Sequence, residues 1–383
     1  MEKKKQERPN TYMKQSNLLI FNWRDPRHPL AGGAEQMVFE HAKIWEKQGY
    51  SITWFASAFR KGKSEEDIEG IKVIRRGSHY TVFFWAFIFF LRGKFKDINI
   101  VVDCFHFLPY FSILYMRRAK KIAIIHEVAG NLWFDNLTFP LAIVGYYLEP
   151  HIIRLYKKVT FITGGDSVKK DLVSLGLSSS KINVINHGIR KSGITKFKKE
   201  KQPVLIFLGR ISKDKGIEDA LMTLSLLTRD YKNIMLWIVG KSESKDYEKR
   251  VKSLTKEFEV HKNCKWFGYV DEKEKYLLLS KAWILIHPSR KEGWGLNVIE
   301  ANSVGTPAVG YRVSGLLDSI VDQKTGILVD CESLSMADGV ESLLEDKKKL
   351  EEMRKQALEW SRKFNWENAG KKSLELISKI TKT

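Results

Sequence analysis

Two glutamates with seven residues between them, Glu292 and Glu300, are the residues of this 383-residue sequence whose types and spacing point most directly to chemistry. Glu292 lies in a glycine-containing loop, and Glu300 falls about one turn inside the helix that we expect to follow. Backbone N–H groups at the start of that helix, near Leu296 and Asn297, can donate to a phosphate, while carboxylates accept hydrogen bonds from sugar hydroxyls. A carboxylate pair can also act as the acid and base of a glycosidase. A carboxylate inside a helix, behind a phosphate-binding turn, fits nucleotide binding better.

A pair of cationic side chains precedes the glutamates. Arg210 follows an apolar segment at residues 204–208 that we expect to be a strand, and Lys215 comes just before a helix expected from Ile217. Arginine presents a planar fork of donors and lysine a point charge, and both suit a diphosphate. The two side chains are therefore candidates for the phosphate-binding part of the same site.

Two further segments that follow predicted strands contain candidate ligand contacts. Gly32 and Gly33 open a helix predicted at residues 34–48, where closely approaching N–H groups favour an anion. The loop before them is long for a strand-to-helix connection, although a glycine pair can also simply make a tight turn. His126 ends a strand predicted at residues 122–126, on the edge where parallel sheets bind ligands. A histidine that only hydrogen-bonds a backbone carbonyl is the alternative.

These residues are positioned by short apolar segments that alternate with helical patterns, which predicts two parallel α/β sheets. The first series of predicted strands comprises residues 17–22, 51–55, 71–75, 98–102, 122–126, 160–163 and 182–185. The second comprises residues 204–208, 234–239, 264–267, 283–287, 307–309 and 327–329, with a helix-rich segment from about Ser333. A polar, lysine-rich segment between the series predicts a linker. The expected fold is α/β, with two doubly wound, Rossmann-like domains facing a central cleft.

The composition indicates folded domains and an anionic partner. With 383 residues, an apolar fraction of 43% and only 9 Pro, the chain is long enough for two cores and is neither disordered nor collagen-like. The formal net charge is +20, and residues 1–199 carry 33 Lys and Arg against 17 Asp and Glu, so we expect the anionic partner to meet this half. The three cysteines lie far apart, which excludes a disulfide framework or a CxxC metal site and suits a reducing compartment.

The N-terminal half also contains an aromatic apolar stretch followed by basic residues. Residues 81–91 include Phe83, Phe84 and Trp85, and Arg92, Lys94 and Lys96 come next. A helix of this kind beside a basic cluster is typical of binding to anionic lipid, although it could equally be buried against a sheet. Nucleic acid is disfavoured because no nucleic-acid-binding motif accompanies the cluster. The longest uncharged apolar stretches have 11 to 13 residues, too few to span a bilayer, and residues 1–16 do not resemble a signal peptide.

Taken in order, these segments resemble the retaining GT-B glycosyltransferases, in particular the large family four (glycosyl transferases group 1). Glu292 and Glu300 resemble the E-x7-E motif of that family. The other matching segments, in the order of the family, are Gly32-Gly33-Ala34-Glu35, Ile125-His126, Asn186-His187-Gly188-Ile189, Gly209-Arg210 with Lys215-Gly216, and residues 292–296. The resemblance covers residues 17–329. Trp294 stands where the family usually has Phe, and His187 interrupts an Asn-Gly step, so no role is carried onto His187.

The resemblance implies a role for each matching position. The catalytic residues would be His126 near the reacting carbon, Glu292 on the hydroxyls of the transferred sugar, and Arg210 and Lys215 on the leaving diphosphate. Glu300 would hold the ribose. The implied donor-binding set is Gly32, Gly33, Arg210, Lys215, Val270, Glu292, Gly293, Trp294, Gly295, Leu296, Asn297 and Glu300.

The polar, lysine-rich segments and the resemblance together predict how the chain is divided. Residues 1–16 would be a flexible basic tail, 17–190 the acceptor-side domain, 191–202 a linker and 203–364 the nucleotide-sugar-binding domain. Residues 365–383 would form a helix that crosses back to the N-terminal domain.

We therefore expect a retaining glycosyltransferase that moves a hexose-type sugar from a UDP- or GDP-sugar to a hydroxyl of a membrane lipid or lipid-linked saccharide. It would be cytoplasmic and peripheral on the cytosolic face of an anionic membrane, with no nucleic-acid partner. No acidic cluster follows a suitable strand, so the basic residues would stabilise the leaving group and no metal or other cofactor is expected. The alternatives are a nucleotide-sugar epimerase of the same fold, a transferase acting on a soluble acceptor or polysaccharide, and a scaffold that has lost catalysis. The presence of Arg210, Lys215, Glu292 and Glu300 argues against the scaffold.

Overall fold

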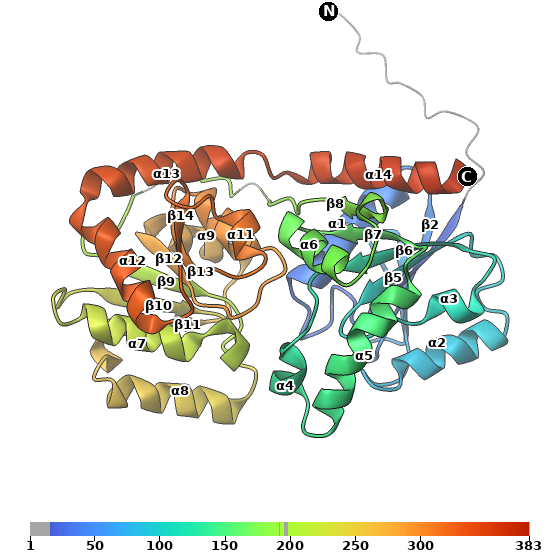
Figure 1. Ribbon diagram of the computed structural model, residues 1–383, viewed down its shortest axis with the longest axis horizontal. Coiled ribbons are helices and arrows are strands. Elements are labelled where there is room, and N and C mark those ends of the chain that lie inside the picture. The colour runs from blue at the N-terminus through green and yellow to red at the C-terminus, as the bar shows by residue number, and fades with distance from the viewer. Residues whose placement is uncertain (1–15, 191, 195–197, 383) are drawn as a thin grey trace, which may run out of the picture. The chain divides into compact units, whose positions relative to one another are not determined.

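The computed structural model describes residues 16–190, 192–194 and 198–382, which form two β-sheets flanked by helices (Figure 1). The predicted tail and linker lie partly outside these described residues. Contacts between residues divide the chain into two units. The first contains residues 16–125, 158–162 and 370–382, and the second contains residues 126–157 and the described part of 163–369. This division groups residues 126–157 with the second unit, and the domain boundaries expected from the sequence stay predictions.

Eight strands form the first sheet, in the order β3-β4-β2-β1-β5-β6-β7-β8. Their bounds are β1 Asn17–Phe21, β2 Ser51–Ala56, β3 Glu65–Ile68, β4 Ile71–Arg75, β5 Ile100–Phe105, β6 Lys120–Ile125, β7 Thr160–Thr163 and β8 Ile182–Val184. β1 pairs in parallel with both β2 and β5, so the strand order reverses at β1. Doubly wound sheets bind ligands beyond the carboxyl ends of the strands at such a reversal.

Two features of this sheet differ from the sequence pattern. β3, with the sequence EEDI, pairs antiparallel with β4 at the edge of the sheet, where charged side chains are tolerated because one side stays in water. β5 runs beyond the predicted segment 98–102 and includes the buried Asp103. The Asp103 carboxylate accepts the N–H groups of Tyr110 at 2.7 Å and Ser112 at 3.1 Å, which satisfies the charge inside the sheet.

A buried ion pair fixes the long loop between β1 and the first helix. Arg75, at the end of β4, is 1% exposed, and its guanidinium meets both carboxylate oxygens of Asp25 at 2.6 and 2.8 Å. This bidentate geometry joins the loop to β4, because removal of Arg75 would leave the buried carboxylate of Asp25 without this counter-ion.

The helices of the first unit are α1 Gly33–Lys47, α2 Val82–Leu91, α3 Ser112–Tyr115 and most of α14 Trp366–Lys382. α14 packs on α1, where the indole N–H of Trp45 donates to Ser373 Oγ at 3.0 Å. The last helix of the chain is thus part of the first unit from residue 370 onward.

Six parallel strands form the second sheet, in the order β11-β10-β9-β12-β13-β14. They are β9 Val204–Leu208, β10 Met235–Val239, β11 Cys264–Gly268, β12 Ile284–His287, β13 Ala308–Tyr311 and β14 Gly326–Val329. The strands agree with the predicted segments to within two residues, and the predicted α/β class with two Rossmann-like domains is confirmed.

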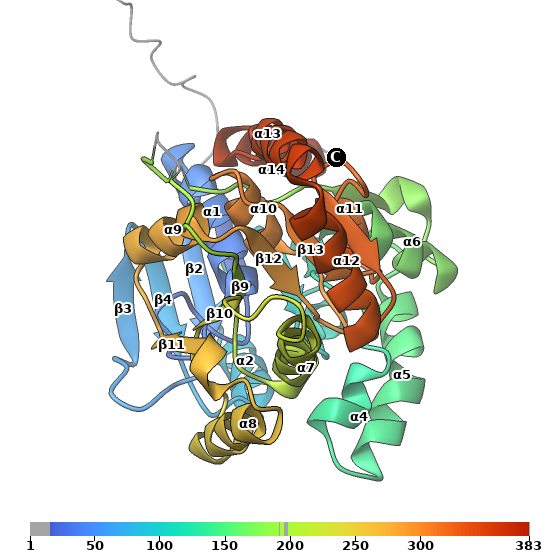
Figure 2. The ribbon, with the colours of Figure 1, turned by 90° about the vertical axis from the view of Figure 1, so that its left-hand side faces the viewer.

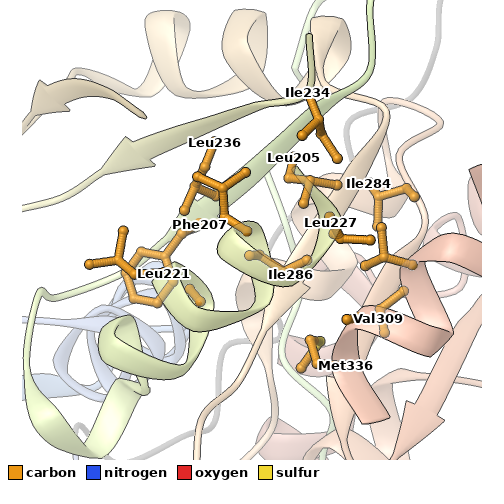
Figure 3. Close-up of a cluster of buried hydrophobic side chains, with 14 of the residues drawn as sticks. Leu205, Phe207, Leu221, Leu227, Ile234, Leu236, Ile284, Ile286, Val309 and Met336 are labelled. Carbon is orange, nitrogen blue, oxygen red and sulfur yellow. The ribbon is translucent and has the colours of Figure 1, made fainter. Parts of the chain in front are cut away.

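Helices cover both faces of this sheet (Figure 2). They are α7 Ile217–Leu227, α8 Lys245–Glu257, α9 Glu272–Lys281, α10 Leu296–Asn302, α11 Leu316–Ser319, α12 Ser333–Glu345 and α13 Lys347–Ser361, while α4 Leu132–Asn136, α5 Leu141–Leu155 and α6 Asp166–Ser174 come earlier in the chain. Side chains alternate between the faces of a strand. Leu205 and Phe207 of β9 therefore pack with Leu221 of α7 and Met336 of α12 (Figure 3), and Ile206 packs with α9 and α10 on the other face.

Candidate active site

The loop between β12 and α10 carries Glu292 and lies against the backbone of His126. Gly293 has no room for a side chain, because a Cβ atom there would lie 2.5 Å from the carbonyl oxygen of His126. This close approach of two backbones requires glycine. It brings the predicted strand-end histidine and the predicted glutamate loop into one place within the second unit.

A second backbone contact brings Lys215 to the same loop. Lys215 ends a short 3-10 turn at Lys213–Lys215, and Gly216 follows with a φ of 71°. A Cβ atom on Gly216 would lie 2.1 Å from the carbonyl oxygen of Pro288, so both the φ and the contact require glycine. From this position the Lys215 ammonium reaches Glu292, with Nζ 2.8 Å from Oε2.

Two carboxylates lie close enough to Lys215 to shift its pKa. Burial alone would lower the pKa of Lys215, but the carboxylates of Glu292 and Glu127 outweigh burial and raise it. Burial would likewise raise the pKa of Glu292, but Lys215 holds it below its ordinary value. For Glu127, burial wins over the attraction of Lys215, and its pKa is raised. One ammonium therefore faces two carboxylates, of which Glu292 is held in the charged form.

Arg210 lies at the end of β9 and is half exposed. Its guanidinium is 3.1 Å from Asp214 Oδ2 and 3.3 Å from Ser212 Oγ. Burial would raise the pKa of Asp214, but Arg210 and the other donors lower it. The charged fork of Arg210 is thus oriented by a carboxylate one residue before Lys215 and stays accessible to an anion.

Glu300 and Asn297 lie on α10, as the sequence predicts. Burial raises the pKa of Glu300 despite the ammonium of Lys275, whose Nζ is 2.7 Å from Oε1. The Asn297 side chain donates to the carbonyl oxygen of Leu208 at 2.7 Å and so ties the first turn of α10 to the end of β9. The side-chain amide of Asn297 therefore stabilises the fold. The phosphate contact expected for this residue involves only its backbone N–H.

The remaining predicted residues of the second unit have different surroundings. The Trp294 side chain is 4% exposed and packs in a cluster with Ile299 and Phe364. The ring of His126 lies 6.0 Å from that of His187, measured between centroids. Val270, after β11, is partly buried against the core. Gly295 caps α10 and Leu296 begins it.

Gly32 and Gly33 belong to the first unit, at the start of α1. The N–H of Gly32 donates to Glu35 Oε2 at 2.7 Å, so a side chain of the helix already caps this terminus. The φ of Gly32 is −133°, which any residue can adopt. The structure thus explains the start of α1 without an anion, and the phosphate role of the glycine pair stays a prediction.

Three residues at this site carry no role in the sequence-based predictions. Glu127 directly follows His126, and Lys275 comes three residues after the start of α9, but neither position shows which charge it will meet. His287 ends β12 and is 4% exposed, with Nε2 3.6 Å from Glu292 Oε2. Its place at the carboxyl end of a central strand is the signal that points to it.

Within the described residues, no group of three or more His, Cys, Asp or Glu side chains could hold a metal ion. No helix in this part of the chain combines the length and the apolar character needed to cross a membrane.

Comparison with known proteins identifies two sequence families that together cover most of the chain. Residues 31–192 match Glycosyltransferase Family 4, and residues 191–360 match Glycosyl transferases group 1. The glycogen synthase of Mycobacterium tuberculosis is 25% identical over 243 residues, which are 62% of this chain and only 58% of the relative. Among solved structures, Anabaena HepE in complex with UDP and glucose superposes with a TM-score of 0.73 at 15% identity, over 95% of this chain and 100% of that one.

A further solved structure, the glycosyltransferase WaaG of lipopolysaccharide biosynthesis, has a TM-score of 0.75 at 15% identity, over 94% of this chain and 99% of that one. These structural matches show the fold. The chain belongs to the family 4 (group 1) glycosyltransferases and has their GT-B fold.

Proposed function

We propose that this protein is a retaining, metal-independent glycosyltransferase that moves a hexose-type sugar from a UDP- or GDP-sugar to a hydroxyl of a membrane lipid or lipid-linked saccharide. The observation that carries the proposal is the contact of Lys215 Nζ with Glu292 Oε2 at 2.8 Å, beside the backbone of His126. A diphosphate can compete with Glu292 for Lys215. The carboxylate of Glu292 is then free to accept hydrogen bonds from sugar hydroxyls.

Charge stabilisation of the leaving group is the main catalytic contribution in this scheme. As the sugar C1–O bond to the phosphate breaks, negative charge develops on the diphosphate. Lys215 and Arg210 neutralise it, helped by the N–H groups of Leu296 and Asn297. Because these donors supply the positive charge, we propose that no metal is required.

The sugar is held by Glu292, with His126 beside the reacting carbon. The acceptor oxygen forms the new bond to C1 on the face that the phosphate leaves, so the anomeric configuration is kept. The acceptor proton passes to the departing phosphate oxygen, which balances the step without a protein base. Glu300 accepts hydrogen bonds from the ribose hydroxyls, and the loop up to Val270 contacts the nucleobase.

HepE, a protein of this fold, binds UDP and glucose, and this supports a nucleotide-sugar donor. The donor is tested by a thermal-shift and hydrolysis screen with UDP- and GDP-sugars. We expect one nucleotide sugar to raise the melting temperature and to turn over. Glu292→Ala should abolish transfer, and unchanged activity of this variant would exclude the assignment of Glu292. Formation of an epimer from the donor alone would favour the alternative, a nucleotide-sugar epimerase.

The lipid part of the proposal rests on α2. Val82 and Ala86 are buried, and Phe83 and Trp85 pack partly against the core of the first unit. Phe84, Phe87 and Leu91 are 64%, 40% and 66% exposed, and their spacing places them on one helix face. Arg92, Lys94 and Lys96 are exposed just beyond the helix. Exposed aromatic side chains beside cations favour an anionic lipid surface.

A second exposed apolar surface occurs around α5 of the second unit. Phe139, Leu141, Tyr147 and Leu148 are 80%, 59%, 68% and 48% exposed. WaaG acts in lipopolysaccharide biosynthesis, which is consistent with a lipid-linked acceptor for this fold. We propose on these grounds that the protein works at the cytosolic face of a membrane.

Flotation with liposomes tests the membrane proposal. We expect the protein to float with vesicles of phosphatidylglycerol and phosphatidylcholine at low salt and to bind less as salt is raised. The triple variant F84S/F87S/L91S should lose flotation. Leu334→Ser is the matched control, because Leu334 is 58% exposed on α12 of the other unit. Equal flotation of the triple variant and the control would contradict the role of α2.

A further inference from the structure

We infer that His287 is a positioning residue that holds the carboxylate of Glu292 in the orientation in which it accepts the hydroxyls of the donor sugar. This inference rests on the proposed function, because it deepens the role given there to Glu292. His287 touches no substrate in this scheme and acts only through Glu292.

The geometry that supports the inference is a line of three side chains. His287 is 4% exposed at the end of β12, and Ser289, two residues on, is fully buried. His287 Nδ1 lies 3.3 Å from Ser289 Oγ, and Nε2 lies 3.6 Å from Glu292 Oε2. Nε2 is buried and has no hydrogen-bond partner among the described residues, so the carboxylate just beyond hydrogen-bond distance is the group it faces.

Burial also decides the charge of the imidazole. Burial lowers the pKa of His287 to about 4, although Glu292 opposes this shift. The ring is therefore neutral at pH 7, with one nitrogen a donor and the other an acceptor. If Ser289 donates its O–H to Nδ1, Nε2 carries the proton and points it at Glu292. A neutral donor of this kind orients a carboxylate without neutralising it.

The position of Lys215 explains why Glu292 would need a second partner such as His287. Lys215 Nζ and His287 Nε2 approach the same oxygen, Glu292 Oε2, at 2.8 and 3.6 Å. When the diphosphate draws Lys215 away, Glu292 loses its ammonium partner while its second oxygen must meet the sugar. His287 comes from a central strand whose other residues are all buried, so it stays in place through this exchange. Oε2 can then close the remaining gap to Nε2.

The test compares two substitutions that retain different halves of the imidazole. In His287→Gln the side-chain amide can place an N–H near the position of Nε2, whereas in His287→Asn it reaches only the position of Nδ1. The readouts are the donor KM and kcat, the affinity for the nucleoside diphosphate without sugar, and the melting temperature.

We expect His287→Asn to lower kcat/KM for the donor by about tenfold to a hundredfold, the effect of losing a hydrogen bond to a charged group. The affinity for the nucleoside diphosphate should not change, and His287→Gln should restore most of kcat/KM. If His287→Asn proves too unstable to assay, Ser289→Ala should lower kcat/KM in the same direction and by less, since it removes only the donor to Nδ1.

The outcomes separate the two proposals. Suppose that the wild-type enzyme turns over its donor. If His287→Asn then has the same kcat/KM as the wild type, or if His287→Gln has no higher kcat/KM than His287→Asn, the positioning role of His287 alone would be overturned. A wild-type protein that neither binds nor turns over any UDP- or GDP-sugar would contradict the proposed function itself.

Discussion

Replacement of Lys215 by Met separates the structural role of the Lys215–Glu292 pair from the role in binding a diphosphate that we propose for Lys215. Lys215 Nζ lies 2.8 Å from Glu292 Oε2, and the side chains of Lys215 and Glu292 are 24% and 19% exposed. At an effective dielectric constant of about 20, this separation corresponds to an attraction of about 6 kcal/mol before desolvation is subtracted. Removal of one partner of a buried pair costs about 3–5 kcal/mol. Because about a fifth of each side chain reaches water, we expect K215M to lose about 3 kcal/mol, near the lower limit of that range.

The double variant K215M/E292Q is the decisive control. It removes both charges while keeping side chains of similar size, so it should recover most of the stability that K215M loses. Activity should behave differently. Loss of one donor to a developing anion costs about 10²–10³ in kcat, and the double variant should be at least as inactive as K215M.

The assays are urea unfolding followed by tryptophan fluorescence and, separately, donor turnover. Recovered stability without recovered activity is the result that we expect. If K215M/E292Q is as unstable as K215M, the two side chains are not coupled and the reasoning from the 2.8 Å contact is refuted.

Three further predictions concern single side chains. Arg75→Met should lower the free energy of unfolding by about 3–5 kcal/mol in urea denaturation, because it leaves Asp25 charged and buried; a loss below 1 kcal/mol would contradict the buried pair. Burial holds the pKa of His287 at about 4, so between pH 6.5 and pH 4 the unfolded chain binds a proton that the folded chain does not. Stability should therefore fall by up to about 3 kcal/mol as the pH is lowered through that window, and H287Q should show a smaller fall. Glu149 accepts N–H groups of Ala129 at 2.6 Å and Gly130 at 2.8 Å, so E149Q should cost about 2 kcal/mol and speed amide exchange at both positions, whereas unchanged exchange would argue against this tether.

The sheets could be predicted well because their central strands are continuous apolar segments between turns. β9 and β12 are buried on both faces, and such strands carry the strongest signal in a sequence. β3 carries the opposite signal, since its acidic residues belong to an exposed edge. The predicted strand stops before Asp103, because an isolated carboxylate rarely lies inside a sheet. In the structure the N–H groups of the following loop donate to Asp103, and this allows the strand to continue through it.

For the candidate site, the positions of Glu292, Glu300, Arg210 and Lys215 followed from motifs, but their partners did not. The motif spacing places Glu300 on a helix and says nothing of Lys275, which reaches it from α9. The contact of Lys215 with Glu292 joins residues 77 apart and depends on the φ of Gly216. The aromatic character of α2 was evident, but only the packing of Val82 and Ala86 shows which face remains exposed.

The contacts at Gly216 and Gly293 also limit how the donor preference of such an enzyme could be redesigned. Both contacts join main chain to main chain, at Pro288 and His126, so the path of the loop does not depend on any rotamer. An engineer who lengthens this loop would break both contacts at once, and the Lys215 ammonium and the Glu292 carboxylate would separate with them. Altered sugar preference should therefore be sought by exchanging side chains on an unchanged main chain.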